Sequence, residues 1–331
     1  LGVRRGLEDG AFADQLGVKE FEVGQVAVVG DGDAALVQVG EHRLDIAQEA
    51  AAGGRIAGVA HGRAAGHAGH QVGAAEGLAH QALVNYGAYT SFRVEHGAVR
   101  GLDLHLARLG QAAVELFGES PGEAEFRRLI ALAVAGRDKA WMRISLFSPE
   151  IGHRNPSFVG QPKVMTVVSP PPPPVATQMR VTAVHYEREP AHLKHVATFG
   201  ATRARRTVRA AGFDDALFVD EQGHMSEGVT WNIGFIQGDR IVWPQAPMLA
   251  GVTQVLFERG LAGLGLSSQT RPVHVSELAG FDGAFLCNSA TPACPITAVD
   301  DTVFAVDPTL LTVFETAWAD NNPLPLTVPH S

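Results

Sequence analysis

Lys194 is the residue whose type and surroundings first suggest covalent chemistry. It lies in the segment EPAHLKHVATFG, between a predicted strand and a predicted helix, and its neighbours Leu193 and Val196 are apolar. A desolvated lysine loses its proton more readily, and the neutral amine can form a Schiff base with a carbonyl group. Most lysines are solvated, so this pattern carries weight only in combination with other groups.

Three further segments hold groups that would accompany such an amine. Glu227 lies in SEGVTWN, which follows a strand and a glycine turn. LAGVT (249–253) opens a helix and so offers free backbone N–H groups and a positive dipole end to an anion. CNSATP (287–292) ends a strand with hydroxyls and small residues. A reactive amine, a carboxylate and a helix N-terminus for phosphate are the parts that a pyridoxal phosphate site requires.

Strands and helices must interleave to bring these segments together. The hydrophobic patterns predict two strands within 90–101, and strands at 141–147, 163–169, 179–187, 216–220, 231–237, 240–244 and 283–289. Helices are predicted at 104–117, from a Ser120–Glu123 capping box to about 135, at 198–211, at 253–262 and from Asp307 to about 319. This order indicates two α/β or α+β domains. For the helix at 104–117, Asp103 is the predicted N-cap and Gly118 the C′ residue, and the apolar face contains Leu106, Leu109, Ala113, Leu116 and Phe117.

An unbroken run of prolines, Pro170 to Pro174, separates the two halves of the chain. Such a run must be extended and cannot occupy a central strand. We therefore interpret 169–177 as the interdomain linker, 58–168 as an N-terminal α/β domain and 178–331 as a C-terminal domain. The alternative is an interaction protein built around a recognition site for a proline-binding module, which deletion of the run would test.

Residues 1–57 form an uncertain N-terminal extension, and the sequence leaves open whether it is native to the fold. Within it, Gly30-x-Gly32-x-x-Ala35 permits a dinucleotide-binding turn, but no amphipathic helix follows at once. A hairpin turn at Asp31–Gly32 is the favoured interpretation. We also predict no metal site, because solvated loop histidines are the simpler interpretation of His61, His67, His70 and His80.

The composition is that of a chain able to bury a core. Of its 331 residues, 46% are hydrophobic and 18% are charged. The formal net charge of −9 argues against a nucleic-acid partner. Two cysteines, Cys287 and Cys294, cannot form a disulfide framework or a four-ligand zinc site, which fits a reducing cytoplasm. We expect no membrane span, because no apolar run reaches 18 residues, and no signal peptide, because the opening LGVRRGLEDGAF is charged.

Taken together, the segments resemble the class IV aminotransferases, the fold-type IV pyridoxal phosphate enzymes. This family includes branched-chain and D-amino acid aminotransferases and aminodeoxychorismate lyase. The matching stretches, in order, are 86–109, 193–195, 212–235, 249–254 and 287–296. The resemblance implies a two-domain α/β (α+β) architecture with the active site between domains. It also implies pyridoxal 5'-phosphate as cofactor, an amino acid or keto acid as substrate, and a homodimer.

The family roles transfer to individual residues of this chain. By resemblance, Lys194 forms the internal aldimine and moves the substrate proton, and Glu227 faces the pyridine nitrogen. The residues that match the family's phosphate contacts are Arg108, Val252, Thr253, Ser289 and Thr291. The candidates for the substrate are Tyr89, which matches an active-site aromatic residue, and Arg143 and Arg154, because arginine binds carboxylates bidentately.

Phe199 is the main departure from the family pattern. Many aminotransferases of the family have a tyrosine there that contacts the cofactor's phenolic oxygen, whereas the lyase branch often lacks it. The LKH triplet at 193–195 also looks like the lyase branch. The favoured function is an aminotransferase. The alternatives are an aminodeoxychorismate lyase-type β-elimination that releases pyruvate and a degenerate pyridoxal phosphate-binding protein without turnover.

Overall fold

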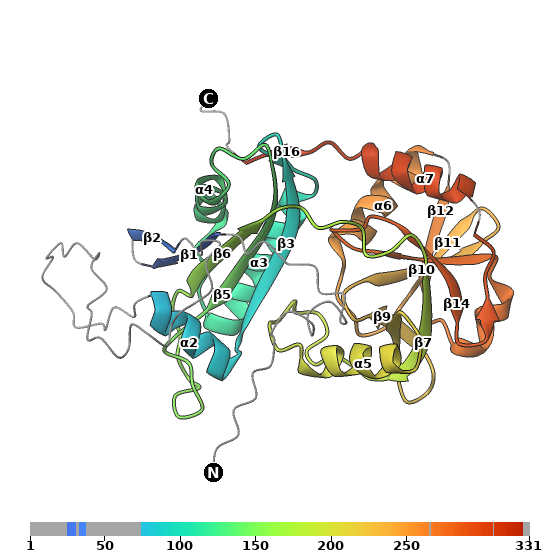
Figure 1. Ribbon diagram of the computed structural model, residues 1–331, viewed down its shortest axis with the longest axis horizontal. Helices are drawn as coiled ribbons and strands as arrows, with labels where there is room; N and C mark the ends of the chain where they lie inside the picture. The colour runs from blue at the N-terminus through green and yellow to red at the C-terminus, as the bar shows by residue number, and fades with distance from the viewer. Residues whose placement is uncertain (1–24, 31–32, 38–73, 265, 307, 327–331) are drawn as a thin grey trace, which may run out of the picture.

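The computed structural model describes residues 25–30, 33–37, 74–264, 266–306 and 308–326, which form two lobes side by side (Figure 1). The first lobe contains β1 (Gln25–Gly30), β2 (Asp33–Val37), α2 (Ala74–Val84), β3 (Gly87–Glu95), β4 (Ala98–Val99), α3 (Leu102–Phe117), α4 (Glu123–Ala133), β5 (Lys139–Phe147), β6 (Lys163–Ser169) and the C-terminal β16 (Leu324–Pro325). None of the helices in the described part of the chain has the length and apolar character needed to cross a membrane.

The second lobe follows the proline run. It contains β7 (Met179–His185), α5 (Phe199–Ala210), β8 (Asp215–Val219), β9 (Met225–Gly228), β10 (Asn232–Gln237), β11 (Arg240–Pro244), α6 (Val252–Gly263), β12 (Ser267–Arg271), the 3-10 helix η1 (Val275–Gly280), β13 (Gly283–Cys287), β14 (Cys294–Val299), β15 (Thr302–Val303) and α7 (Pro308–Ala319). Helices and strands thus interleave in both lobes, as predicted.

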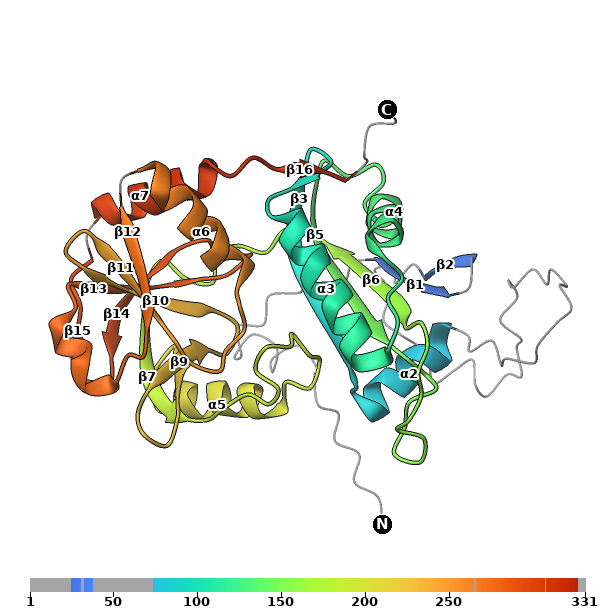
Figure 2. The ribbon, with the colours of Figure 1, turned by 180° about the vertical axis from the view of Figure 1, so that it is seen from behind.

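The first lobe is an antiparallel sheet in the order β16-β4-β3-β5-β6-β1-β2. Along β6, buried and half-buried residues alternate, because successive side chains point to opposite faces. Helices α3 and α4 cover one face of the sheet (Figure 2). Leu106 and Leu109 of α3 pack in one core with Met142 and Ile144 of β5, so the predicted apolar face of this helix is confirmed.

Glycines, and not side-chain caps, set the start of α3 and α4. α3 begins after Gly101, whose φ is 64°, so Asp103 lies within the first turn and its prediction as the N-cap is wrong. α4 begins after Gly122, whose φ is 86°; Ser120 accepts a hydrogen bond from the Gly122 N–H at 3.2 Å, and the predicted capping box is absent from this helix. Glycine adopts these positive φ angles without steric cost. Gly118 ends α3 in the left-handed conformation, as predicted.

The sheet of the second lobe closes on itself. β9 pairs with both β8 and β10, so that β10, β13, β14, β7, β8 and β9 form a ring, from which β11 and β12 extend. Every residue of β8 and β13 is buried, which is why DALFV and GAFLC form nearly continuous apolar runs. Helix α5 lies at one end of this lobe, and α6 and α7 lie at the other (Figures 1 and 2).

Part of the N-terminal segment 1–57 belongs to the first sheet. β1 and β2 are antiparallel with Gly30 opposite Asp33, which confirms the hairpin interpretation and not the dinucleotide-binding one. β1 also pairs with β6 over five residues, from Gln25 to Val29. The rest of 1–57 lies outside the described residues, as do the histidines His61, His67 and His70.

The predicted linker is the first of two crossings between the lobes. In the range 169–177, the carbonyl oxygen of Pro172 accepts a hydrogen bond from Arg93 of the first lobe at 3.2 Å. The Val175 N–H donates to the hydroxyl of Thr291 of the second lobe at 2.9 Å. The linker is therefore held by both lobes.

The second crossing follows α7. There the Asn321 side chain donates hydrogen bonds of 2.9 Å to the carbonyl oxygens of Leu256 and Ala317. The chain then returns to the first lobe, where β16 pairs with β4. The segment predicted as the C-terminal domain, 178–331, thus contributes its last strand to the sheet of the other lobe.

Candidate active site

The predicted site residues meet in a cavity of about 420 Å³ that both lobes line. The first lobe contributes residues of β3, α3 and β5, and the second contributes the segment before α5, β9, β10, the start of α6 and the loop after β13. The predicted residues among its lining are Tyr89, Arg108, Arg143, Lys194, Glu227, Val252, Thr253 and Ser289. Thr291 and Arg154 do not line it.

Lys194 is held in place by its own backbone. Its carbonyl oxygen accepts a hydrogen bond from the N–H of Tyr89 at 2.9 Å, and the Val196 N–H donates to Gly87 at 3.0 Å, so this segment runs antiparallel to the start of β3. The Lys194 amine lies 5.0 Å from the centroid of the Tyr89 ring.

The electrostatic surroundings of Lys194 make its amine easier to deprotonate. Burial of the amine lowers the pKa from 10.5 to about 7, and the positive charges of Arg108 and Arg188 act in the same direction, while Glu227 opposes them. A considerable fraction of the side chain is therefore neutral near pH 7. Only the neutral amine is a nucleophile.

Glu227 lies on β9 and is paired with Arg188, a residue that the sequence analysis did not identify. Arg188 Nε and Nη2 donate to Glu227 Oε1 at 3.1 and 3.0 Å, and the Leu249 N–H donates to Oε2 at 3.2 Å. Burial raises the pKa of Glu227, while Arg188 and the Leu249 N–H lower it. In the sequence, Arg188 stands between two glutamates in YEREP, a pattern typical of a solvated surface, so its role gave no local signal.

An anion cradle lies where Arg108 meets the start of α6. Arg108 Nη2 donates to the Thr90 hydroxyl at 2.8 Å, and Nη1 donates to the Ala250 carbonyl at 3.4 Å. Two buried polar atoms of the cradle, Arg108 Nε and the hydroxyl oxygen of Thr253, have no hydrogen-bond partner among the described residues. Burial lowers the pKa of Arg108 to about 10, so the guanidinium remains charged at neutral pH. Orphaned buried donors beside a helix N-terminus fit a phosphate group.

Gly251 allows the chain to enter α6 at this point. The Asn232 side chain donates a hydrogen bond of 2.9 Å to the Leu249 carbonyl oxygen, and its own oxygen lies directly against Gly251. A Cβ atom on residue 251 would clash with that oxygen. The glycine is therefore required by a close approach of two chain segments.

Arg143 and Tyr89 also line the cavity, and their side chains contact each other. The Arg143 guanidinium lies 3.6 Å from the centroid of the Tyr89 ring, an arrangement that favours a cation over an aromatic face. Its Nε donates to the Ser145 hydroxyl at 3.4 Å, and it forms no ion pair within the described part of the chain. Burial lowers the pKa of Arg143.

Arg205 is a second cavity residue that the sequence analysis did not identify. It forms a two-point ion pair with Asp215, at 3.0 and 2.7 Å, and Asp215 also accepts a hydrogen bond from the Trp231 indole at 2.8 Å. The charges of Arg205 and Arg188 are thus balanced by carboxylates. Among the arginines of the cavity, Arg108 and Arg143 are left without a carboxylate partner in the described chain.

Two predicted site residues lie elsewhere. Thr291 is buried beside the cavity wall, but its hydroxyl accepts the hydrogen bond from Val175 of the linker, and the neighbouring residues Asn288, Ser289 and Ala290 line the cavity instead. Arg154 is exposed in the loop between β5 and β6.

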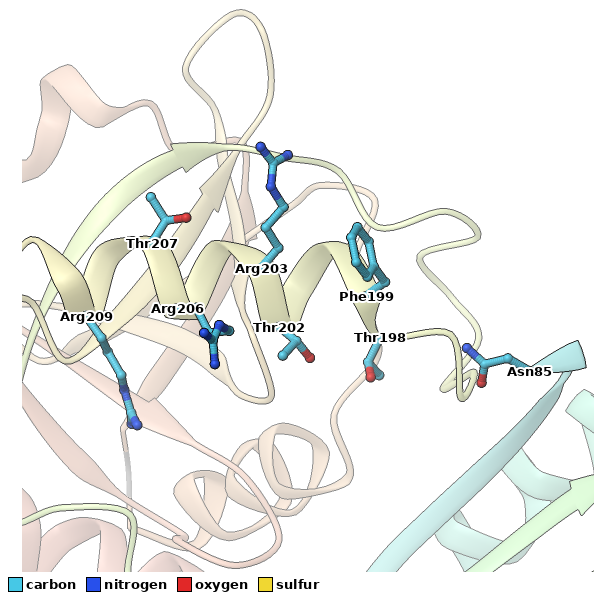
Figure 3. A pocket seen from close by; sticks show the side chains of 8 residues that line it. All are labelled: Asn85, Thr198, Phe199, Thr202, Arg203, Arg206, Thr207 and Arg209. Atoms are coloured by element: carbon cyan, nitrogen blue, oxygen red, sulfur yellow. The ribbon is translucent and has the colours of Figure 1, made fainter. Parts of the chain in front are cut away.

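Phe199 also lies outside the cavity. It is the first residue of α5, and 80% of its surface is exposed. With Asn85 and several residues of α5, it lines a second, open hollow of about 830 Å³ (Figure 3). The residue at this position therefore does not shape the wall around Lys194, whereas its neighbours Thr198 and Thr202 line both hollows.

Comparisons with known proteins agree with the architecture. A family model described as amino-transferase class IV matches residues 87–299. A probable branched-chain-amino-acid aminotransferase of Rickettsia felis is 27% identical over 113 residues, which are 34% of this chain and 39% of that protein. A putative branched-chain-amino-acid aminotransferase of Methanocaldococcus jannaschii is 23% identical over 237 residues, 68% of this chain and 82% of that protein.

The fold is also that of a solved aminotransferase. The branched-chain aminotransferase of the archaeon Thermoproteus uzoniensis, solved with norvaline, superimposes with a TM-score of 0.66 at 19% identity, over 75% of this chain and 92% of that one. The sequence matches are shorter: the first two curated relatives are matched over only 39% and 33% of their own length.

Proposed function

The chain belongs to the class IV aminotransferases, and from that premise and the geometry of its cavity we propose that it transfers amino groups with pyridoxal 5'-phosphate as cofactor. The observation that carries the proposal is the position of Lys194. Its amine, with a pKa of about 7, faces a cavity that also holds the Glu227 carboxylate and the anion cradle of Arg108. The aminotransferase names of the relatives support the reaction type.

The residues present fit this cofactor. Arg108 Nε and the Thr253 hydroxyl are buried without partners at the N-terminus of α6, where a phosphate group would satisfy them. Val252 would add backbone N–H donation at the same helix start, and Ser289 reaches the cavity from the loop after β13. When bound, pyridoxal phosphate supplies an aldehyde carbon that reacts with amines and a ring that withdraws electrons from the substrate's α-carbon.

The chain's own groups then have separate tasks. Lys194 would hold the cofactor through its neutral amine, and the same amine, when free, would take the α-proton of the substrate as a base and deliver it to the cofactor's carbon as an acid. Glu227 would stabilise a positive charge on the cofactor's ring nitrogen, and the hydrogen bonds from Arg188 would orient that carboxylate and favour its ionised form.

The charge balance of the cavity indicates the class of substrate. Arg108 and Arg143 are the cavity arginines without a carboxylate partner among the described residues, so the site is built for two anionic groups. One is the cofactor's phosphate, at Arg108. The other is a carboxylate at Arg143, which lies against the Tyr89 ring. An amino acid, converted to its keto acid, meets this requirement.

The test starts with the absorption spectrum of the purified protein with added pyridoxal phosphate. Borohydride reduction followed by peptide mapping should then place a pyridoxyl group on Lys194. Amino acids would be supplied with and without a keto acid acceptor. Keto acid formation that requires the acceptor supports the aminotransferase. Pyruvate release without an acceptor would instead identify the lyase reaction, and cofactor binding without either product would identify a binding protein that does not turn over.

The proposal extends to assembly as a homodimer, which rests on the family resemblance. Sedimentation velocity of the purified protein checks it. A single species at the monomer mass of 35.0 kDa over the working concentration range would contradict it.

A further inference from the structure

Behind Arg108, a line of hydrogen bonds leads away from the cavity to a buried histidine. Thr90 of β3 and His105 of α3 are 0% and 1% exposed, and the Thr90 Oγ1 lies 2.7 Å from His105 Nδ1. The same oxygen accepts the hydrogen bond from Arg108 Nη2 at 2.8 Å. Thr90 does not line the cavity, while its strand neighbours Tyr89 and Ser91 do, because side chains alternate across a strand.

The Thr90 hydroxyl connects the guanidinium to the imidazole. A guanidinium can only donate, so the Thr90 oxygen accepts from Arg108 with one lone pair. The hydroxyl keeps its hydrogen and a second lone pair, and through one of them it hydrogen-bonds to His105 Nδ1, with the direction set by the tautomer of the ring. Burial lowers the pKa of His105 well below its usual value, and the positive charges of Arg108 and Lys194 act in the same direction.

Two hydrogen bonds hold the Arg108 guanidinium, and the one to Thr90 is the shorter. The alternative contact, from Nη1 to the carbonyl oxygen of Ala250, is 3.4 Å long and comes from the other lobe. An arginine held by one weak contact would have to give up side-chain freedom when it binds an anion, which reduces affinity.

We propose that Thr90 and His105 are positioning residues that preset the Arg108 guanidinium for an anionic group in the cavity. His105 Nδ1 and Arg108 Nη2 share the Thr90 hydroxyl, so the buried imidazole holds in place the oxygen to which the guanidinium is bound. For the identity of the anion, the cofactor's phosphate, this inference rests on the proposed function.

The experiment measures affinity and not turnover. Dissociation constants for pyridoxal phosphate and for pyridoxal, which lacks the phosphate, are determined by fluorescence for the apoprotein and its variants. Thr90→Val keeps the shape and removes the hydroxyl, and it should weaken pyridoxal phosphate binding about tenfold or more while pyridoxal binding stays within about twofold. Thr90→Ser restores the hydroxyl and should restore the affinity.

A second pair of variants tests the role of His105. His105→Asn can place an acceptor oxygen near the Nδ1 position and should retain most of the phosphate-dependent affinity, whereas His105→Leu should lose it. Thr297→Val is the matched control, because it removes a hydroxyl that donates to the Met179 carbonyl at 3.2 Å, away from the cavity. It should bind both probes as the wild type does.

The outcomes separate this inference from the proposed function. An equal loss of both affinities in Thr90→Val, or no loss at all, would overturn the inference even if the enzyme is an active aminotransferase. A wild-type protein that binds pyridoxal phosphate but never turns over would remove the proposed function. The inference would then still stand if the phosphate-dependent loss and its rescue by serine are seen.

Discussion

Arg188 holds Glu227 and the backbone beside Lys194 at the same time. Its guanidinium lies 3.0 Å from Glu227 Oε1, and it also donates to the carbonyl oxygens of Ala191 and Leu193. One side chain therefore fixes the carboxylate relative to the segment that carries the reactive lysine. A displacement of the Arg188 side chain would therefore move both the Glu227 carboxylate and the segment that carries Lys194.

The first prediction concerns the cost of breaking this pair. Glu227→Gln is expected to lower the free energy of unfolding by about 3 kcal/mol, because Arg188 stays buried after its counter-charge is removed. Urea unfolding of the apoprotein measures it. The control is Glu125→Gln in the exposed pair with Arg128, which should cause no resolvable change. Equal free energies of unfolding for the two variants would contradict the expected stabilisation by the buried pair of Arg188 and Glu227.

The pKa of Lys194 predicts the pH dependence of its reaction with aldehydes. Because the pKa is lowered to about 7, the neutral amine becomes dominant as the pH rises through 7. The rate of Schiff-base formation with pyridoxal should therefore rise from about pH 6 to about pH 8 and then level off. Stopped-flow absorbance of the apoprotein gives the profile. A rate that keeps rising toward about pH 10, as for a solvated lysine, would contradict it.

Gly251→Ala should disrupt the anion cradle without a change of charge. The added methyl group collides with the Asn232 side chain, whose other end is tied to Leu249, so the start of α6 must shift. We expect the affinity for pyridoxal phosphate to fall about tenfold or more. Gly280→Ala serves as the control, because a Cβ atom there meets nothing within 4 Å. Titration followed by fluorescence distinguishes the two variants.

Arg143 and Arg154 are the two arginines proposed from the sequence for the substrate carboxylate, and they can be told apart. Arg143→Gln should reduce kcat/KM for an amino acid by roughly 10- to 100-fold, since a charge-assisted hydrogen bond is lost. Its activity toward an amine without a carboxylate should change little. Arg154→Gln removes an exposed arginine outside the cavity and should have no effect. Steady-state kinetics with both substrates would contradict the assignment if Arg154 were the sensitive residue.

The sequence predicted best what local patterns encode. Lys194 stood out through its apolar neighbours, and the start of α6 through its glycine and hydroxyl residues, because both signals lie within a few residues. Arg188 and Arg205 were missed because each takes its role from a carboxylate on another element, Glu227 of β9 or Asp215 of β8. No local pattern distinguishes such an arginine from a solvated one.

The starts of the helices and the pairing of the last described strand were also hard to predict, because neighbouring or distant residues decide them. Asp103 and Ser120 are good capping residues by type, but the neighbouring glycines fix the backbone first. The pairing of β16 with β4 joins segments that lie far apart in the sequence, and a two-residue strand leaves no periodic pattern to detect.

The two crossings between the lobes determine which movements are open to the active site. A domain on a single tether can swivel in any direction, and the walls of the cavity would then part and rejoin at random angles. Here the chain leaves the first lobe at 169–177 and returns through β16, with hydrogen bonds at each passage. These two passages, together with the backbone hydrogen bonds between the Lys194 segment and β3, restrict the rotation of one lobe against the other. Arg108 and Lys194 would therefore keep the same spacing each time that a ligand enters the cavity.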